Sequence, residues 1–235
     1  MMTCPICHTE NHHLAVICSS CGGFLQYRAD NLDLFTTAWE VIERPRRAFH
    51  FIATARHKNY TYILSAFAGI GMMFSIFWIM KAGNYSESLL NLLAAGLALG
   101  PFLGILSTLL YSIIVKLESK VLSLVLSFRN AFAVGAYSLV PIVLSVIFIL
   151  PIELLTFGQY FFSSNPSPFV LRPVSYSVLL TLDALFACWS LALQFVGLRV
   201  LLRIRWTKVL LILVIGNGGI VASVWYLISK FAHVL

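Results

Sequence analysis

The stretch NYTYILSAFAGIGMMFSIFWIM, residues 59–80, decides the fold class of this chain. Its 22 residues include no charged side chain. At 1.5 Å per residue, a helix of this length is about 33 Å long, which matches the hydrocarbon core of a bilayer at roughly 30 Å. The sequence therefore predicts a transmembrane helix here.

Four more apolar runs of similar length follow, at about residues 89–115, 132–155, 177–198 and 209–229. Of the 235 residues, 60% are hydrophobic and 11% are charged, whereas soluble domains average about 45–50% and 25%. No soluble core of 26.2 kDa buries that much apolar surface. We therefore expect an all-α membrane protein with a bundle of five transmembrane helices, and this excludes an ordinary soluble enzyme.

The basic residues divide unevenly between the two sides of such a bundle. With the N-terminus inside the cell, thirteen Lys and Arg lie on the inner side and three on the outer side. The inner group comprises Arg28, Arg44, Arg46, Arg47, Arg56, Lys58, Lys116, Lys120, Arg129, Arg199, Arg203, Arg205 and Lys208, and the outer group Lys81, Arg172 and Lys230. The positive-inside rule predicts a cytoplasmic N-terminus and, after five spans, an outer C-terminus. The rule also explains the net charge of +7, so nucleic acid is not an expected partner.

Amphipathic helices are predicted at the inner membrane interface, before the first span and between the second and third spans. The first begins at the N-cap candidate Asp33 and ends before Pro45, and a second follows from Arg46. Their apolar positions are Leu34, Phe35, Ala38, Trp39 and Ile42 in the first helix, Phe49, Ile52 and Ala55 in the second, and Leu117, Val121, Leu124, Val125 and Phe128 between the spans. Packing against the cytoplasmic end of the bundle is the alternative.

Glycines recur every four residues in the second span, at Gly96, Gly100 and Gly104. This spacing places them on one helix face, where the absent side chains allow another helix to approach closely. We expect intramolecular packing or a contact between copies in a homo-oligomer, and a border of a ligand path is the alternative.

Four of the five cysteines lie in two CxxC pairs near the N-terminus, Cys4 with Cys7 and Cys18 with Cys21. Two such pairs, separated by ten residues, suit a tetrahedral Cys4 zinc site with no open ligand position, so a structural role is expected. Disulfides are the competing interpretation, which a cytoplasmic location disfavours. Iron is the alternative metal, and His8, His12 and His13 are close enough to replace a ligand.

The segment CPICHTENHHLAVICSSCGGFL, residues 4–25, resembles the zinc-ribbon module at the N-terminus of many bacterial and archaeal membrane proteins. That module has the pattern CPxCG, a polar spacer and FCxxCGxxL, and here His8 replaces the first glycine. The resulting domain prediction is a cytoplasmic zinc ribbon at 1–27, an amphipathic juxtamembrane segment at 28–58 and a membrane domain at 59–235.

Three short motifs of the membrane part resemble the Yip-domain family, the Ypt/Rab-interacting membrane proteins and their prokaryotic relatives. The first is the Pro-Arg-x-x-Phe pattern of ERPRRAF at 43–49. The second is AYSLVP at 136–141, which is similar to the family's Gly-Tyr-Ser-Leu-x-Pro with Ala136 at the glycine position, and the third is the stretch from Trp189 to Gly197-Leu198-Arg199 before a basic loop. The resemblance covers about residues 35–230 and implies five spans with a cytoplasmic N-terminus. Eukaryotic members bind small GTPases, but the Asp-Leu-Tyr-Gly-Pro motif associated with them is absent here.

Two acidic residues lie within predicted spans, where a charge is costly and function is the default hypothesis. Asp183 is six residues, or about 9 Å, into the fourth span, and Glu153 is near the outer end of the third. With Gln194 and Asn217 they are candidates to line a polar path. The alternative is that Asp183 pairs with Arg172 or a neighbouring hydroxyl and only fixes helix packing.

No catalytic set is evident: the sequence has no HExxH, GxSxG or Walker A motif, and all six histidines lie outside the predicted spans. We therefore expect a non-enzymatic scaffold or adaptor in a prokaryotic cell membrane. Its expected partners are the lipid bilayer and a cytoplasmic protein that binds the zinc ribbon. The alternative function is a small-solute or ion transporter or channel that uses Asp183 and Asn217.

Overall fold

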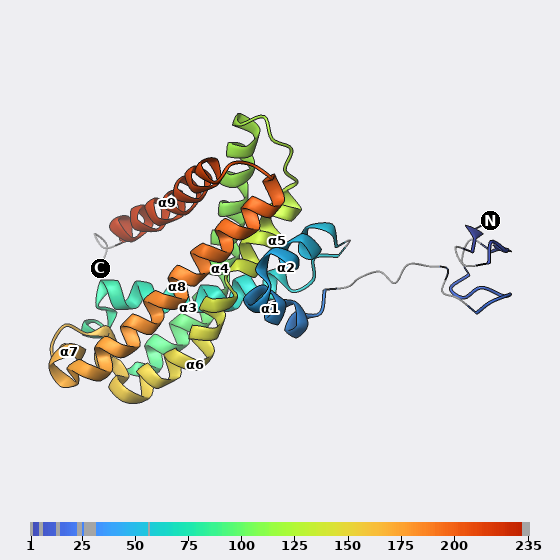
Figure 1. Ribbon diagram of the computed structural model, residues 1–235. Helices are drawn as coiled ribbons and strands as arrows, with labels where there is room; N and C mark the ends of the chain where they lie inside the picture. Colours follow the sequence, from blue (N-terminus) through green and yellow to red (C-terminus); the bar gives the residue numbers. More distant parts are fainter. Residues whose placement is uncertain are drawn as a thin grey trace.

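The computed structural model describes residues 2–4, 7–12, 15–22, 25, 32–55 and 57–231. Two short strands, β1 (Met2–Thr3) and β2 (Glu10–Asn11), pair antiparallel, and the other regular elements are helical. The helices are α1 (Leu34–Glu43), α2 (Pro45–Thr54), α3 (Thr61–Met80), α4 (Leu89–Val121), α5 (Phe128–Ser138), α6 (Val140–Phe157), α7 (Pro168–Leu171), α8 (Pro173–Leu202) and α9 (Trp206–Phe231), with 3₁₀ turns η1 (Ala82–Asn84) and η2 (Gly158–Phe162) (Figure 1).

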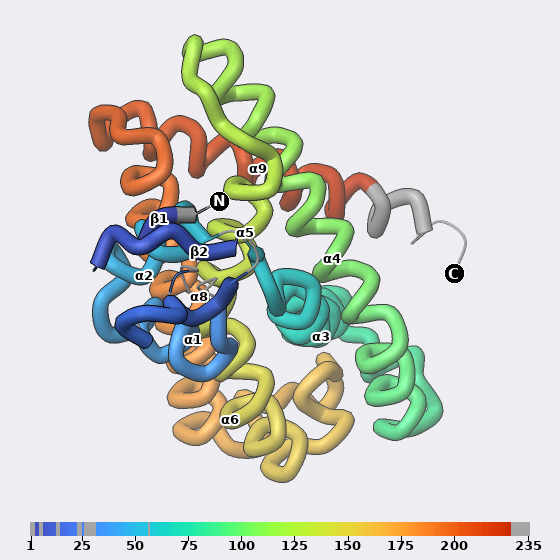
Figure 2. The backbone as a smooth tube through the Cα atoms, turned by 90° about the vertical axis from the view of Figure 1, so that its right-hand side faces the viewer, coloured from blue at the N-terminus to red at the C-terminus, as the bar shows by residue number. Residues whose placement is uncertain are grey.

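The prediction of five membrane spans is confirmed. Helices α3, α4, α8 and α9 each provide one span, and α5 and α6 together provide the third. The chain is thus an integral, multi-pass membrane protein. Helix α9 lies along one side of the bundle, against α4 and α8, and α1 and α2 lie at one end (Figures 1 and 2).

The third span is divided in two at Leu139. Its N–H bonds back to the carbonyl of Ala136, which ends α5, and α6 starts at Val140 with Pro141 in its first turn. Proline has a fixed φ and no N–H, so it suits a helix start but not a helix interior.

Helices α3 and α4 are packed backbone against backbone. A Cβ atom added to Gly104 would lie 1.9 Å from the carbonyl oxygen of Ser65, and one added to Gly100 would lie 2.7 Å from Cα of Ile70. Gly69 of α3 faces the same two glycines, with the Gly100 carbonyl oxygen 2.1 Å from its ideal Cβ position. Only glycine allows this approach, because any side chain would overlap main-chain atoms.

Gly96 lies two turns before Gly104 on the same face of α4. The ring of Phe74 occupies the space beside it, 2.6 Å from an ideal Cβ position. We call Gly69, Gly96, Gly100 and Gly104 the glycine seam. Within one chain, the face of α4 that carries this seam is covered by α3.

The two juxtamembrane helices pack on the end of the bundle, but only part of the apolar face predicted for α1 is covered there. Asp33 caps α1 as expected, since its carboxylate accepts the Thr36 N–H at 2.9 Å. Leu34, Ala38 and Ile42 pack against the core at this end of the bundle. Phe35 and Trp39, by contrast, are 82% and 66% exposed, because the 100° step per residue turns them to the side. Exposed aromatic side chains at this level are typical of a membrane interface.

The predicted interfacial helix between the second and third spans is wrong. Nothing breaks the helix after Val115, so α4 continues through Leu117 to Val121. The chain then turns at Ser123, whose φ is +57°, and α5 begins at Phe128. The apolar stripe is therefore distributed over the end of one helix, a loop and the start of the next.

The three resemblance motifs meet in one buried core. Phe49 of α2 lies against Gly197 of α8. A Cβ atom added to Gly197 would be 3.2 Å from the Phe49 ring and 2.6 Å from the side chain of Val134 in α5. Tyr137 is fully buried, and its hydroxyl donates to the carbonyl of Asn59 at 2.8 Å. These residues thus hold α2, α5 and α8 together and have a packing role.

Candidate functional site

The N-terminal segment brings its four cysteines together around a short hairpin. Pairing of β1 with β2 places Cys4 directly after the first strand, and its N–H donates to the Thr9 carbonyl at 3.0 Å. Asn11 at the end of β2 holds the second pair, since its side-chain oxygen accepts the N–H and the hydroxyl of Ser19, both at 3.0 Å. Asn11 was not predicted, because its role depends on a contact across the hairpin.

The cysteine sulfurs have the spacing that a tetrahedral metal site needs. All four Sγ atoms lie within 4.8 Å of one another. Sγ of Cys4 is 3.7 Å from that of Cys21, and Sγ of Cys7 is 3.6 Å from that of Cys18. Four sulfurs at about 2.3 Å from a zinc ion would be roughly 3.8 Å apart. These separations are too long for S–S bonds, so the cluster fits a metal ion and not the disulfide alternative.

Local hydrogen bonds favour the thiolate form that a metal requires. Bonds from the side chain and backbone of Thr9 lower the pKa of Cys7 to about 6. Backbone N–H groups of Cys21 and Ser20 lower the pKa of Cys18. Because protons compete with the metal for each sulfur, metal affinity is expected to fall as the pH is lowered.

The residue after each CxxC pair adopts a left-handed backbone. His8 has φ +57° and Gly22 has φ +70°, and the N–H groups of both bond back to the first cysteine of their pair. His13 lies outside the described residues. His8 thus occupies a conformation that glycine adopts without steric cost.

This strain predicts that His8→Gly stabilises the metal-bound head. We expect a gain of about 1 kcal/mol, measured as slower loss of metal to a chelator, because the Cβ penalty of a left-handed residue is removed. Gly22→Ala is the matched opposite change and should accelerate the loss. An accelerated loss in His8→Gly would mean instead that the imidazole itself supports the metal site.

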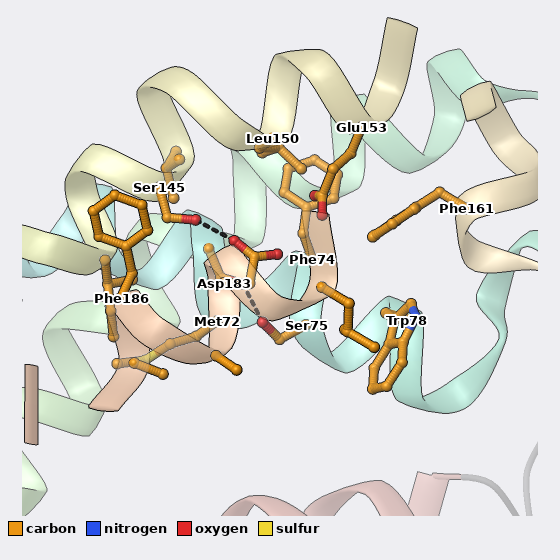
Figure 3. A pocket seen from close by; sticks show the side chains of 16 residues that line it. Met72, Phe74, Ser75, Trp78, Ser145, Leu150, Glu153, Phe161, Asp183 and Phe186 are labelled. Atoms are coloured by element: carbon orange, nitrogen blue, oxygen red, sulfur yellow. Dashed lines mark hydrogen bonds between the residues drawn. The ribbon is translucent and has the colours of Figure 1, made fainter. Parts of the chain in front are cut away.

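A second candidate site lies within the membrane, between α3, α6 and α8. Glu153 of α6 and Asp183 of α8 point into one cavity of about 300 Å³ (Figure 3). Asp183 Oδ1 accepts a hydrogen bond from the hydroxyl of Ser145. The partner of Asp183 is therefore a neighbouring hydroxyl, and among the described residues the ion pair found is Glu43 with Arg44, not Asp183 with Arg172. Ser145 was missed, since one serine in an apolar run gives no sign of the side that it faces.

Asp183 lies further along its helix than the sequence predicted. Because Pro173 begins α8 four residues before the predicted start at Ser177, Asp183 is ten residues into the helix, or about 15 Å.

Asn217 does not join the two acidic residues, so the prediction of one shared polar path is corrected. Its amide donates to the side chain of Gln194 and to the carbonyl of Leu213, both at 2.9 Å. Gln194 is eleven residues beyond Asp183, about 16 Å further along α8. Asn217 and Gln194 line a separate cavity of about 460 Å³, whose lining comes mainly from α3, α4, α8 and α9. The two cavities have three lining residues in common, the apolar Met72, Ile142 and Ala187.

The comparisons concern the membrane part of the chain. A family model of the Yip1 domain matches residues 39–228. No curated protein and no solved structure matches. The matched range runs from α1 into α9 and does not include the cysteine cluster.

Proposed function

The chain belongs to the Yip1 domain family, and from this premise we propose that it is a non-enzymatic membrane scaffold or adaptor whose cytoplasmic head binds another protein. The observation that carries the proposal is the four-thiol cluster ahead of the membrane domain. A shell of four sulfurs would leave no position for a water or substrate, so a metal there would stabilise the head and take no part in catalysis. The residues that would hold it are Cys4, Cys7, Cys18 and Cys21.

Zinc is the metal that we propose, since tetrahedral thiolate sites favour it. A cytoplasmic head agrees with the thirteen-to-three distribution of basic residues, of which Arg28 and Arg56 lie outside the described part of the chain. It also agrees with reduced cysteines, because cytosolic thiols are kept reduced.

The adaptor role is tested by comparing partners of two variants. The full-length protein, purified from its native membrane under mild conditions, should retain a soluble protein that Cys18→Ser loses. Cys188→Ser is the matched control, because Cys188 is an exposed residue of α8 far from the head in sequence. Identical partners in all three preparations would contradict a role of the metal-bound head in binding.

The orientation is tested with a thiol reagent that does not cross membranes, in a protein that also carries Cys188→Ser. A cysteine at Ser164, in the exposed loop after η2, should be labelled from outside. One at Val125, in the loop between α4 and α5 and fully exposed, should react only after the membrane is opened. A buried position at the end of α4, such as Ser119 at 1% exposed, would be protected on either side and cannot serve as this probe. The reverse pattern would place the head outside the cell.

The transport alternative lacks a continuous polar route in the described residues. Asp183 and Asn217 line different cavities, and the residues common to both cavities are apolar. Permeation through both groups is therefore not part of the proposed function.

A further inference from the structure

The cavity between α3, α6 and α8 holds two carboxyl groups and no basic side chain. Helix α6 contacts both α3 and α8, and the side chains that line the cavity come from these three helices and from Phe161 of η2 (Figure 3). Its volume of about 300 Å³ is at the lower end of the range for small-molecule sites. Glu153 and Asp183 are its acidic residues, and none of the residues that line it is Lys or Arg.

No basic side chain lines the cavity to neutralise the acidic pair. Glu153 is 2% exposed, and its Oε1 atom is buried without a hydrogen-bond partner in the described chain. Within the same described part, the ion pair found is Glu43 with Arg44, in the juxtamembrane segment. The two carboxyl groups are hydrogen-bonded to each other, so they can share a proton, and a bound cation offsets the cost of the buried negative charge that remains.

The remaining lining determines which cation fits. The oxygens available from side chains are those of the two carboxyls and the hydroxyl of Ser145, Ser75 being bonded to its own helix. Calcium takes six to eight oxygen ligands and magnesium an octahedral six, so this donor set is poor for either. Aromatic rings of Phe74, Trp78, Phe161 and Phe186 form much of the wall. Aromatic faces next to carboxylates are the environment in which proteins bind organic ammonium groups.

One lysine lies near this wall and already uses an aromatic face. The Nζ atom of Lys81 is 4.7 Å from the centroid of the Trp78 ring, and Lys81 is not among the lining residues. The indole N–H of Trp78 donates to the hydroxyl of Tyr176 at 3.0 Å, which fixes the ring. The ring is therefore held in place without any ligand.

We propose that this cavity binds a small organic ammonium ion, with the cationic nitrogen beside Glu153 and Asp183 and its substituents against the aromatic wall. The site is independent of the adaptor role, because it lies within the spans and uses none of the four clustered cysteines.

The test uses benzyltrimethylammonium as the probe and the full-length protein in lipid nanodiscs. Saturable binding by isothermal titration calorimetry is expected for the unmodified protein, and Glu153→Gln and Asp183→Asn should each weaken it at least about tenfold. Glu87→Gln is the matched control, since Glu87 is exposed and outside the cavity, and it should bind like the unmodified protein. Neopentylbenzene, which has the same shape without the charge, should not displace the probe.

Each other result would overturn the proposal. No saturable binding up to about 10 mM, or unchanged affinity in both acidic-site variants, would show that the carboxyls do not hold an ammonium ion. Displacement of the probe by low concentrations of Na⁺ or Mg²⁺ would identify an inorganic cation site instead. Melting temperatures of the variants, measured without the probe, separate loss of binding from loss of folding.

Discussion

Gly104→Ala is expected to cost the bundle about 3 kcal/mol or more of folding free energy, the upper range for overpacking. The added methyl group would lie 1.9 Å from the Ser65 carbonyl oxygen and 2.6 Å from Cα of Gly69. Both are main-chain atoms, so no side-chain rotation relieves the overlap and α3 must move away from α4. The measurement is the melting temperature of the purified protein in detergent, together with the yield of monodisperse protein, and Gly104→Leu should reduce both further.

The matched control is Gly218→Ala in α9. Gly218 is also a glycine within a membrane span, but nothing lies within 4 Å of its ideal Cβ position. Alanine is the better helix former, so this change should leave the melting temperature unchanged or raise it slightly. A Gly104→Ala protein as stable as the control would contradict the close contact of α3 with α4. If it were stable but lost a dimer, the glycine face would be a contact between copies.

The membrane fold could be predicted from the sequence because lipid allows few solutions. Backbone N–H and C=O groups must be satisfied within each span, so every long apolar run has to be a helix. The spacing of Gly96, Gly100 and Gly104 predicted a close contact in the same way. Its partner was not predicted, since Gly69 of α3 is a single small residue without a repeat, and only the approach of two backbones shows its role.

Contacts between distant segments explain what the sequence did not predict. Helical periodicity gave α1 one apolar face, whereas the bundle covers only half of it and leaves Phe35 and Trp39 exposed. Hydropathy identified Glu153 and Asp183 but could not show that Asn217 faces another cavity. The clustering of the four cysteines was easier to predict, because they lie within 18 residues and come together with little help from the rest of the fold.

Cys18→Ser is expected to release the metal and unfold the head while the five spans stay inserted and folded. Among the described residues of the head, the buried cluster is small and consists of Cys4, Cys18 and Leu25, with Cys7 and Ala15 packed beside it. A structural zinc contributes about 10–16 kcal/mol in small domains, far more than so few apolar contacts can provide. Elemental analysis should find one zinc per chain in the unmodified protein and in Cys188→Ser, and none in Cys18→Ser.

Two further measurements complete the metal test. Limited proteolysis should remove the head of Cys18→Ser at a protease concentration that leaves the unmodified protein intact, because an unfolded segment exposes its backbone to the protease. The melting temperature of the membrane domain should be the same in both, since the described contacts of the thiol cluster are with residues of the head itself. If protein purified without chelator contains no metal, the zinc hypothesis is wrong. If it contains iron and absorbs visible light, iron and not zinc is the metal at the four sulfurs.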